Sequence, residues 1–461
     1  MRTLAAPLLA WALVASPAPP APSAPPRSAL KVDIPFTRYV LRNGLVVILH
    51  EDHSLPQVVV NLWYHVGSKD ERPGRTGFAH LFEHLMFMGS KHVPYDLAKG
   101  AGLFDLIMEA QGGENNADTE TDRTSYYESG PPRLLETFLW LEADRLATLP
   151  DVIDQVKVDR QRRIVQNERR QSIENRPYGK VELVVPAEMF PATHPYGHPV
   201  IGSHADLEAA TAADVRAFFR THYTPSNASL VVAGDFDPES ARTLIEKYLG
   251  WIPASAPPAP PLPGPPVRLS ATKRRTLTDK VELPRSYLIY HAPAEYADGS
   301  AECQVLAAVL GEGKSSRLER SLRIQKQLVQ EIEVVYERRR LGGLFYVIAT
   351  ARPGHSLDEI EQALDAEIKS LREQAPTPAE LERAVASLEM AFAQSLEPVL
   401  GRAERLHHYE YAFGDPGRVG WDLARLRKVT TAGVQAWARQ ALDPGARLML
   451  RVVPEPGKGR P

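Results

Sequence analysis

The chain has 461 residues, a formal net charge of -3 and 43% apolar residues, a balance typical of a globular protein with a large core. Its length predicts two to three domains. The charge gives no electrostatic basis for nucleic-acid binding, and basic runs such as 273–275 and 338–340 are expected to be solvated faces. The single cysteine, Cys303, excludes a disulfide framework and a thiolate metal site.

The N-terminus has the pattern of a secretory signal peptide. Arg2 precedes an apolar stretch from Leu4 to Val14, and small residues follow it. Residues 1–28 are therefore predicted to be a signal peptide with a flexible lead-in, and the mature protein to be periplasmic or extracellular. The apolar stretch is short for a bilayer, and no later segment reaches about 18 apolar residues, so no membrane span is expected.

Residues 29–252 are predicted to form an N-terminal domain of strands and helices. Two apolar runs flank Asn43-Gly44, which is a strong signal for a β-hairpin. The further elements expected here are a strand at 58–64, a helix around 80–84, a strand at 124–127, helices at about 132–146 and 151–173, and a strand at 228–233.

A proline-rich segment at 253–268 is predicted to be an extended linker. Beyond it, residues 269–457 repeat the order of strands, helix, strands, long helices and strand, which predicts an internal duplication. The elements expected there are strands at 287–290, 332–335 and 344–348, and helices from about 301, at 356–374 and at 378–396. The predicted fold is α+β, with two structurally similar halves, each a mostly antiparallel sheet with helices packed on one face.

Three polar residues share one face of the helix predicted around 80–84. The string HLFEH places His80 and His84 one turn apart, with Glu83 on the same face. Two imidazole nitrogens supply half of a tetrahedral zinc shell, which a distant carboxylate and a water would complete. Glu83 is then placed to take the proton of that water, in the reverse of the HExxH order.

The residues around this string are mostly apolar, so the helix is expected to be largely buried. Burying two histidines and a glutamate without partners is costly, and metal coordination would satisfy them. The competing interpretation is a polar triplet that is solvated or satisfied within the core. The histidines of the second half lack ligand spacing and are expected to be structural or surface residues, so one zinc per chain is predicted. They are His291, His355, His407 and His408.

The third zinc ligand is expected to be a carboxylate on one of the two long helices of the first half. The candidates are Glu136, Glu142 and Asp144 on the first helix, and Asp154, Asp159 and Glu168 on the second. The spacing of Ile164, Val165, Glu168 and Ser172 favours Glu168 as the inward-facing acid. A surface glutamate paired with nearby arginines is the alternative, so the pattern alone leaves this ligand open.

Several segments resemble the pitrilysin/insulinase family of zinc peptidases with the inverted motif, which includes mitochondrial processing peptidases. They are residues 41–52, 66–90, 112–127, 164–170, 222–237 and the glycine-rich 311–323. The resemblance implies that His80, His84 and Glu168 bind one zinc ion and that Glu83 is the catalytic base. It also implies that Asn116 and Ala117 pair with an extended peptide substrate; the alternative for Asn116 is a turn residue.

Two positions and one spacing depart from the family pattern. The spacing from His84 to Glu168 is longer than is usual for the family, because of an insertion at residues 100–109. Gln161 stands where members often have a second acid. Active members use an arginine and a later tyrosine of a C-terminal domain to hold the substrate carbonyl; here Arg323 matches the arginine, but Gln330 replaces the tyrosine. The resemblance therefore implies the zinc-bearing catalytic subunit of a homodimer or heterodimer whose homologous partner supplies an Arg/Tyr pair.

The leading hypothesis is an exported zinc-dependent endopeptidase that acts on peptides or unfolded polypeptides. A non-catalytic scaffold or assembly subunit that keeps the peptidase fold is the alternative, and a zinc-binding carrier is a third possibility. The complete HxxEH string favours the enzyme, because neither of the others needs Glu83 beside an open coordination position.

Overall fold

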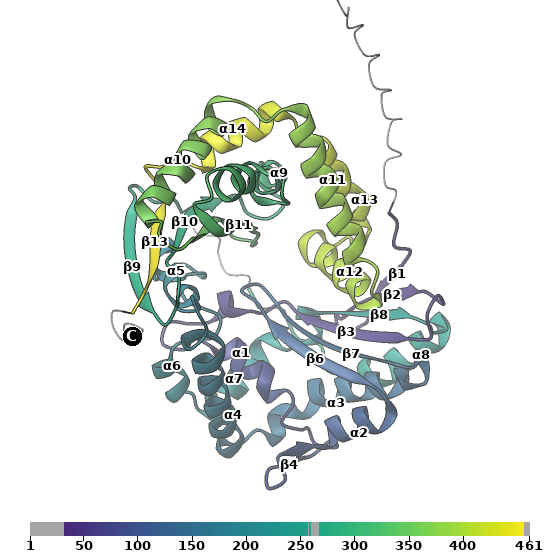
Figure 1. The fold of residues 1–461 in the computed structure, drawn as a ribbon. Helices are drawn as coiled ribbons and strands as arrows, with labels where there is room; N and C mark the ends of the chain where they lie inside the picture. Colours follow the sequence, from purple (N-terminus) through teal and green to yellow (C-terminus); the bar gives the residue numbers. More distant parts are fainter. Residues whose placement is uncertain (1–31, 257, 260–266, 456–461) are drawn as a thin grey trace, which may run out of the picture. The chain divides into compact units, whose positions relative to one another are not determined.

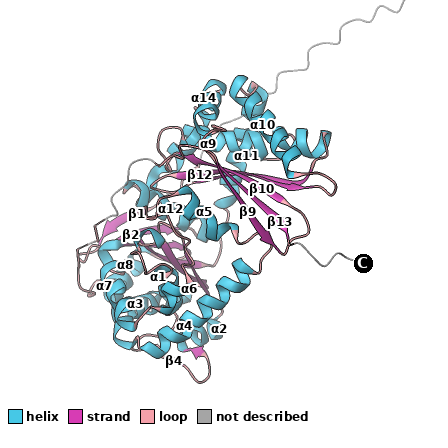
Figure 2. Cartoon of the chain, turned by 90° about the vertical axis from the view of Figure 1, so that its left-hand side faces the viewer, coloured by secondary structure: helices cyan, strands magenta, loops and turns pink. Residues whose placement is uncertain are grey.

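The computed structural model describes residues 32–256, 258–259 and 267–455. The predicted signal peptide at 1–28 lies outside these residues, as do positions 257 and 260–266 of the predicted linker. None of the described helices is long and apolar enough to cross a membrane. Strands of one large sheet come from residues 37–234 and those of another from residues 273–454 (Figures 1 and 2). The domain boundaries proposed from the sequence stay a prediction.

The first sheet has the strand order β1-β2-β8-β3-β7-β6 and is mostly antiparallel. Its central strands β3 and β8 are buried along their whole length, which suits their continuous apolar sequences. The predicted hairpin is confirmed, because β1 and β2 pair antiparallel across Asn43-Gly44. The strands are β1 Thr37–Val40, β2 Val46–Glu51, β3 Val58–Tyr64, β6 Glu114–Thr119, β7 Thr124–Gly130 and β8 Ala228–Gly234. A short hairpin, β4 Tyr95–Asp96 with β5 Ala101–Gly102, lies apart from this sheet.

The second sheet repeats the topology of the first. Its order is β11-β12-β10-β13-β9, which matches β6-β7-β3-β8-β2 of the first sheet strand for strand. The parallel pair β2 and β8 has its counterpart in the parallel pair β9 and β13. The strands are β9 Lys273–Asp279, β10 Arg285–Ala292, β11 Val329–Glu337, β12 Gly343–Ala351 and β13 Leu448–Pro454. The predicted duplication of two similar α+β halves is confirmed.

Helices of the first half cover one face of the first sheet and build its core. Helix α1 packs against α4 and α7, and α3 packs against β3 and α8. These helices are α1 Phe78–Leu85, α2 Leu103–Gln111, α3 Leu135–Val152, α4 Gln155–Glu168, α6 His204–Glu208, α7 Ala212–His222 and α8 Pro238–Leu249.

Helices of the second half build an equivalent core on the second sheet, where α9 and α14 pack together and α10 contacts β10 and β12 (Figure 2). Their bounds are α9 Ser300–Gly311, α10 Leu357–Glu373, α11 Pro378–Ser395, α12 Val399–Phe413, α13 Val419–Arg427 and α14 Thr431–Ala441. The helices predicted from 301, at 356–374 and at 378–396 are therefore confirmed as α9, α10 and α11.

Each sheet receives a helix of the other half on its second face. Helix α12 buries Ala403 and Leu406 against Ile48 and Val231 of the first sheet. Helix α5, Val181–Met189, buries apolar side chains against β10 and β13 of the second sheet. The sequence predicted helices on one face of each sheet, whereas the structure has helices on both faces. The exchange of α5 and α12 joins the two halves.

Several elements differ from the sequence-based expectation. Residues 100–109, expected only as an insertion, contain most of α2. Strand β9 was not predicted, because its Lys- and Arg-rich sequence at a sheet edge leaves most of its side chains exposed and shows no apolar alternation. The helix expected at 151–173 is α4, which passes into a π-helix, Arg169–Glu174, directly after Glu168.

Candidate active site

The N-terminus of α1 is held by a glutamate from outside the helix. Gly77 occupies the N-cap in the left-handed region (φ 85), and a Cβ atom there would lie 2.8 Å from the carbonyl oxygen of Ile201. Because glycine has no capping side chain, Glu71 takes that role. Its carboxyl accepts hydrogen bonds from the backbone N–H groups of Gly77 at 2.9 Å and Ala79 at 2.7 Å. This contact fixes the helix that carries the HxxEH residues.

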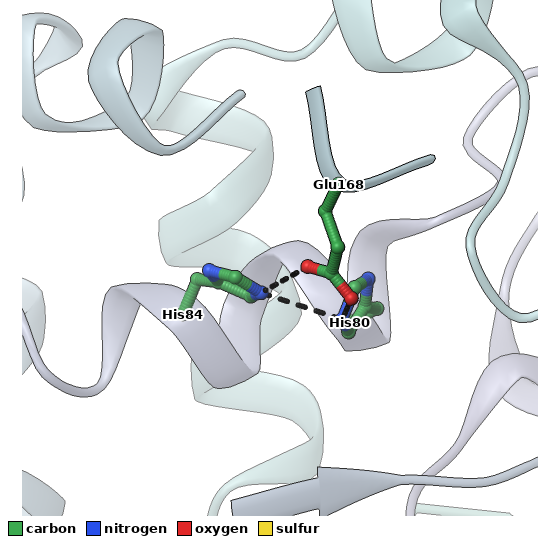
Figure 3. A group of neighbouring side chains, drawn as sticks. All are labelled: His80, His84 and Glu168. Atoms are coloured by element: carbon green, nitrogen blue, oxygen red, sulfur yellow. Dashed lines mark hydrogen bonds and ion pairs between the residues drawn. The ribbon is translucent and has the colours of Figure 1, made fainter. Parts of the chain in front are cut away.

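The structure brings His80, His84 and Glu168 together (Figure 3). The Nε2 atoms of the two histidines are 3.3 Å apart. Glu168 approaches from α4, with Oε2 at 3.2 Å from His84 Nε2 and Oε1 at 3.7 Å from His80 Nε2. Ligand atoms around a tetrahedral zinc ion at about 2.1 Å are about 3.4 Å apart, so this donor set fits zinc. Zinc binding itself stays a prediction.

The protonation states in this cluster also suit a divalent metal. Burial, and then the nearby His84, lower the pKa of His80 to about 4, so its imidazole is neutral at neutral pH. The hydrogen bond from His84 lowers the pKa of Glu168, which favours its carboxylate form. Neutral imidazole and ionised carboxylate are the forms that bind zinc. The Nδ1 atom of His80 is buried and has no hydrogen-bond partner among the described residues, so packing orients this ring.

The other carboxylates considered as third ligand are engaged elsewhere. Two of them accept hydrogen bonds: Glu142 from buried Arg145, and Asp144 from Ser90 and His92. Asp154 caps the N-terminus of α4. The last two form ion pairs, Asp159 with Arg162 and Glu136 with Lys247. Among the described residues, one group of three histidine, cysteine, aspartate or glutamate side chains is close enough to share a metal ion. It consists of His80, His84 and Glu168.

The reasoning that favoured Glu168 from helix periodicity was partly wrong. Ile164 was expected on the inward face but is 43% exposed. The buried stripe of α4 instead follows Val158, Gln161 and Val165, and it continues at helical spacing to Glu168. Gln161, which stands at the position of the family's second acid, is buried and donates to Met88 Sδ.

Glu83 lies beside the three converging side chains. Its Oε2 atom accepts a hydrogen bond of 2.5 Å from the hydroxyl of Thr119 at the end of β6. Burial raises the pKa of Glu83 to about 7, and the bond from Thr119 opposes that shift. A carboxyl group that titrates near neutral pH is suited to accept and return a proton, and a neighbouring divalent cation would favour its ionised form.

Asn116 and Ala117 lie on β6, the edge strand of the first sheet. They pair with Tyr127 and Tyr126 of β7 on one side, and the other side of β6 has no neighbouring strand in the described chain. The side chain of Asn116 is exposed and accepts from the N–H of Ala117 at 2.9 Å. An open strand edge offers backbone donors and acceptors to an extended peptide, but the substrate role of both residues stays a prediction.

A cavity of about 840 Å³ joins these features. His80, Glu83, Ala117 and Glu168 line it on one side, and residues of α5, β11 and β12 line it on another. Arg323 and Gln330 are absent from the described lining of this cavity and instead line an adjoining one of about 530 Å³, which shares Tyr178 and Arg285 with it. Arg323 is exposed there and pairs with Glu319 at 2.9 Å. Arg323 is therefore not among the residues that line the cavity with His80, Glu83 and Glu168.

Sequence reasoning missed three residues at this site. Thr119 and His198 line the cavity, and Glu71 caps α1. Thr119 follows Asn116 and Ala117 in the segment that carried the resemblance, which is a signal that could have found it. His198 and Glu71 are far apart in sequence, so no local pattern relates them. In the folded chain, Nδ1 of His198 lies 3.5 Å from the carboxyl group of Glu71.

Among its described residues, the second half carries no equivalent cluster. Gly299 caps α9 with φ 85 as Gly77 caps α1, so Glu302, Val305 and Leu306 of α9 correspond to His80, Glu83 and His84. Two of these counterparts are apolar and buried. His407, predicted to be structural, is buried against the first sheet, where its Nε2 donates to Asn61 O and its Nδ1 accepts from Ser229.

Two sequence models of one peptidase family match the chain. The model described as Insulinase (Peptidase family M16) matches residues 46–202, and the one described as Peptidase M16 inactive domain matches residues 209–388. An uncharacterized zinc protease of Streptomyces coelicolor is 29% identical over 422 residues, covering 90% of this chain and 89% of that protein. The zinc protease PqqE of Helicobacter pylori is 29% identical over 360 residues, covering 77% of this chain and 79% of that protein.

Solved structures show the same fold. A protease from Helicobacter pylori superposes with a TM-score of 0.83 at 24% identity, covering 91% of this chain and 100% of that one. The periplasmic protease PqqL from Escherichia coli has a TM-score of 0.76 at 20% identity, covering 92% of this chain and 48% of that one. At these identities the structural likeness establishes the fold alone.

Proposed function

Because this chain belongs to the insulinase (M16) family of peptidases, we propose that it is a zinc-dependent endopeptidase that hydrolyses peptides or unfolded polypeptides. The observation that carries the proposal is the convergence of His80, His84 and Glu168, with Glu83 beside them in one cavity. Relatives named as zinc proteases support both the metal and the reaction.

In this proposal, His80, His84 and Glu168 hold one zinc ion per chain. Bound zinc supplies a Lewis acid that polarises a peptide carbonyl and acidifies water. Glu83 accepts a proton from the attacking water and transfers it to the leaving amine.

The peptide substrate is proposed to bind as an additional strand on β6. Asn116 and Ala117 then contribute main-chain hydrogen bonds, which give affinity with little dependence on the substrate sequence. The cavity of about 840 Å³ has room for several side chains of an extended segment and excludes a folded domain. Unfolded chains and short peptides are therefore the substrate class.

The chain is further proposed to be the catalytic subunit of a homodimer or heterodimer. Arg323 and Gln330 line an adjoining cavity and not the one lined by His80, Glu83 and Glu168, so a homologous partner would supply the arginine and tyrosine that hold the substrate carbonyl. The match to 48% of the PqqL chain supports pairing, because one PqqL chain is long enough for two such units.

Export is the remaining part of the proposal. The leader-like sequence at 1–28 supports it, as does the description of PqqL, a protein of the same fold, as periplasmic. Processing and transport of the full-length chain, followed by cell fractionation, test this part independently of catalysis.

The test of the proposed function combines metal analysis with peptide digestion. The purified chain is depleted of metal, reloaded with zinc, and incubated with a peptide mixture, alone and with a homologous partner chain. We expect one zinc per chain, cleavage that requires zinc, and faster cleavage in the paired form, all read by mass spectrometry. Zinc binding without turnover in any pairing would instead support the scaffold function. Full activity as a monomer would contradict the partner proposal alone.

A further inference from the structure

Thr119 forms a hydrogen bond with the proposed catalytic base. Its hydroxyl donates to Glu83 Oε2 at 2.5 Å. A hydrogen bond to an ionised carboxylate is stronger and more directional than one between neutral groups. It therefore holds one carboxyl oxygen of Glu83 and fixes the plane of the group.

The hydroxyl is presented by a well-anchored hairpin. Thr119 is paired with Thr124 at the end of β6 and β7, and the Thr124 hydroxyl donates to Val66 O at 2.8 Å. In the turn between the strands, Arg123 forms an ion pair with Asp118 and stacks on Trp63 with its guanidinium 4.5 Å from the ring centroid. The position of Thr119 is thus set by the sheet and not by α1.

The strand that carries Thr119 is also the strand on which the peptide is proposed to dock. Ala117 and Thr119 are two residues apart, so their side chains lie on the same face of β6, and both line the cavity with Glu83. Substrate binding along the edge of β6 would therefore act on the same element that orients the base.

We infer that Thr119 is a positioning residue, which holds Glu83 in the orientation for proton transfer and links it to the substrate-binding edge of β6. This inference rests on the proposed function. It predicts that loss of the hydroxyl alone impairs turnover, while zinc binding and peptide binding are kept.

The experiment compares Thr119→Val, which keeps the shape and strand propensity, with Thr119→Ser, which keeps the hydroxyl. For Thr119→Val we expect kcat to fall about 10- to 100-fold with KM within about twofold of wild type and zinc content unchanged. Thr119→Ser should restore most of kcat. Thr276→Val, at an exposed edge-strand position of β9, is the matched control and should behave as wild type.

Crystal structures of the zinc-loaded variants provide a readout that does not depend on activity. We expect the Glu83 carboxyl to keep its orientation in Thr119→Ser and to rotate or spread over several orientations in Thr119→Val. An unchanged Glu83 in Thr119→Val, or a serine variant as impaired as the valine variant, would overturn the inference. If wild type binds zinc but cleaves nothing, the proposed function fails, while the orientation of Glu83 still decides the role of Thr119.

Discussion

The cap on helix α1 gives a quantitative prediction. The Glu71 side chain is completely buried, and its carboxyl accepts from both Gly77 N–H and Ala79 N–H. Replacing Glu71 with alanine leaves both buried donors without an acceptor. An unsatisfied buried donor costs about 1–3 kcal/mol, so the Glu71→Ala variant should lose about 2–6 kcal/mol of unfolding free energy. This is a large part of the roughly 5–15 kcal/mol typical of folded proteins.

Glu71→Gln should be less harmful. Burial raises the pKa of Glu71 well above its usual range, so the neutral carboxyl is favoured and glutamine resembles it in charge and shape. Glutamine keeps one carbonyl oxygen for one of the two donors, which predicts a loss of about 1–3 kcal/mol. The order wild type, glutamine, alanine is therefore expected in stability.

Urea unfolding in metal-free buffer, followed by circular dichroism, measures these differences as shifts of the midpoint at constant slope. Chelator competition should show weaker zinc binding in the same order, because α1 carries His80 and His84. Glu109→Ala, at an exposed position on α2, serves as the control and should unfold as wild type. An alanine variant of Glu71 with the wild-type midpoint would refute the capping role.

Three further predictions concern pH, backbone strain and metal. Burial lowers the pKa of His407 to about 3. Below about pH 6.5 this side chain therefore binds a proton in the unfolded chain but not in the folded chain. The contribution of His407 to the unfolding free energy should therefore fall by about 2 kcal/mol as pH falls to 5, and His407→Gln should lose less stability over the same range in urea titrations. Gly299→Ala should cost about 2–5 kcal/mol, because a Cβ at this positive φ collides with the Trp437 ring. Gly313 also has a positive φ, but a Cβ added there would have no atom within 4 Å. Gly313→Ala should therefore lower the unfolding free energy by only about 1–2 kcal/mol, and equal losses in the two variants would disprove the steric cause. Zinc should raise the thermal midpoint of wild type, and Glu168→Gln should weaken this rise; an equal rise in both would remove Glu168 from the ligand set.

Local signals predicted much of the fold. Asn43-Gly44 favoured a hairpin turn between apolar runs, and β1 and β2 pair there, joined by residues 41–45. The repeated order of elements predicted the duplication, which the matching strand orders confirm. The exchange of α5 and α12 between the halves could not be predicted, because both helices bury residues against strands distant in sequence.

The shared face of His80, Glu83 and His84 on α1 could be predicted, because these residues are close in sequence and helix geometry fixes their relative positions. The third side chain could not be derived in this way. Glu168 was distinguished from the other acids by family resemblance, and the structure supplies the physical reason, since ion pairs and caps engage the others. Glu71 and Thr119 act through contacts between elements, so their own sequence neighbours carry no periodic signal of these roles.

The central claim is that Glu83 serves as the base of a zinc peptidase, and the Glu83→Gln variant tests it most directly. Its zinc content and its cleavage of a peptide mixture are to be measured together, beside wild type and in the same pairing. We predict one zinc per chain in both proteins, with cleavage lost in Glu83→Gln. Wild-type cleavage by the glutamine variant would contradict the claim.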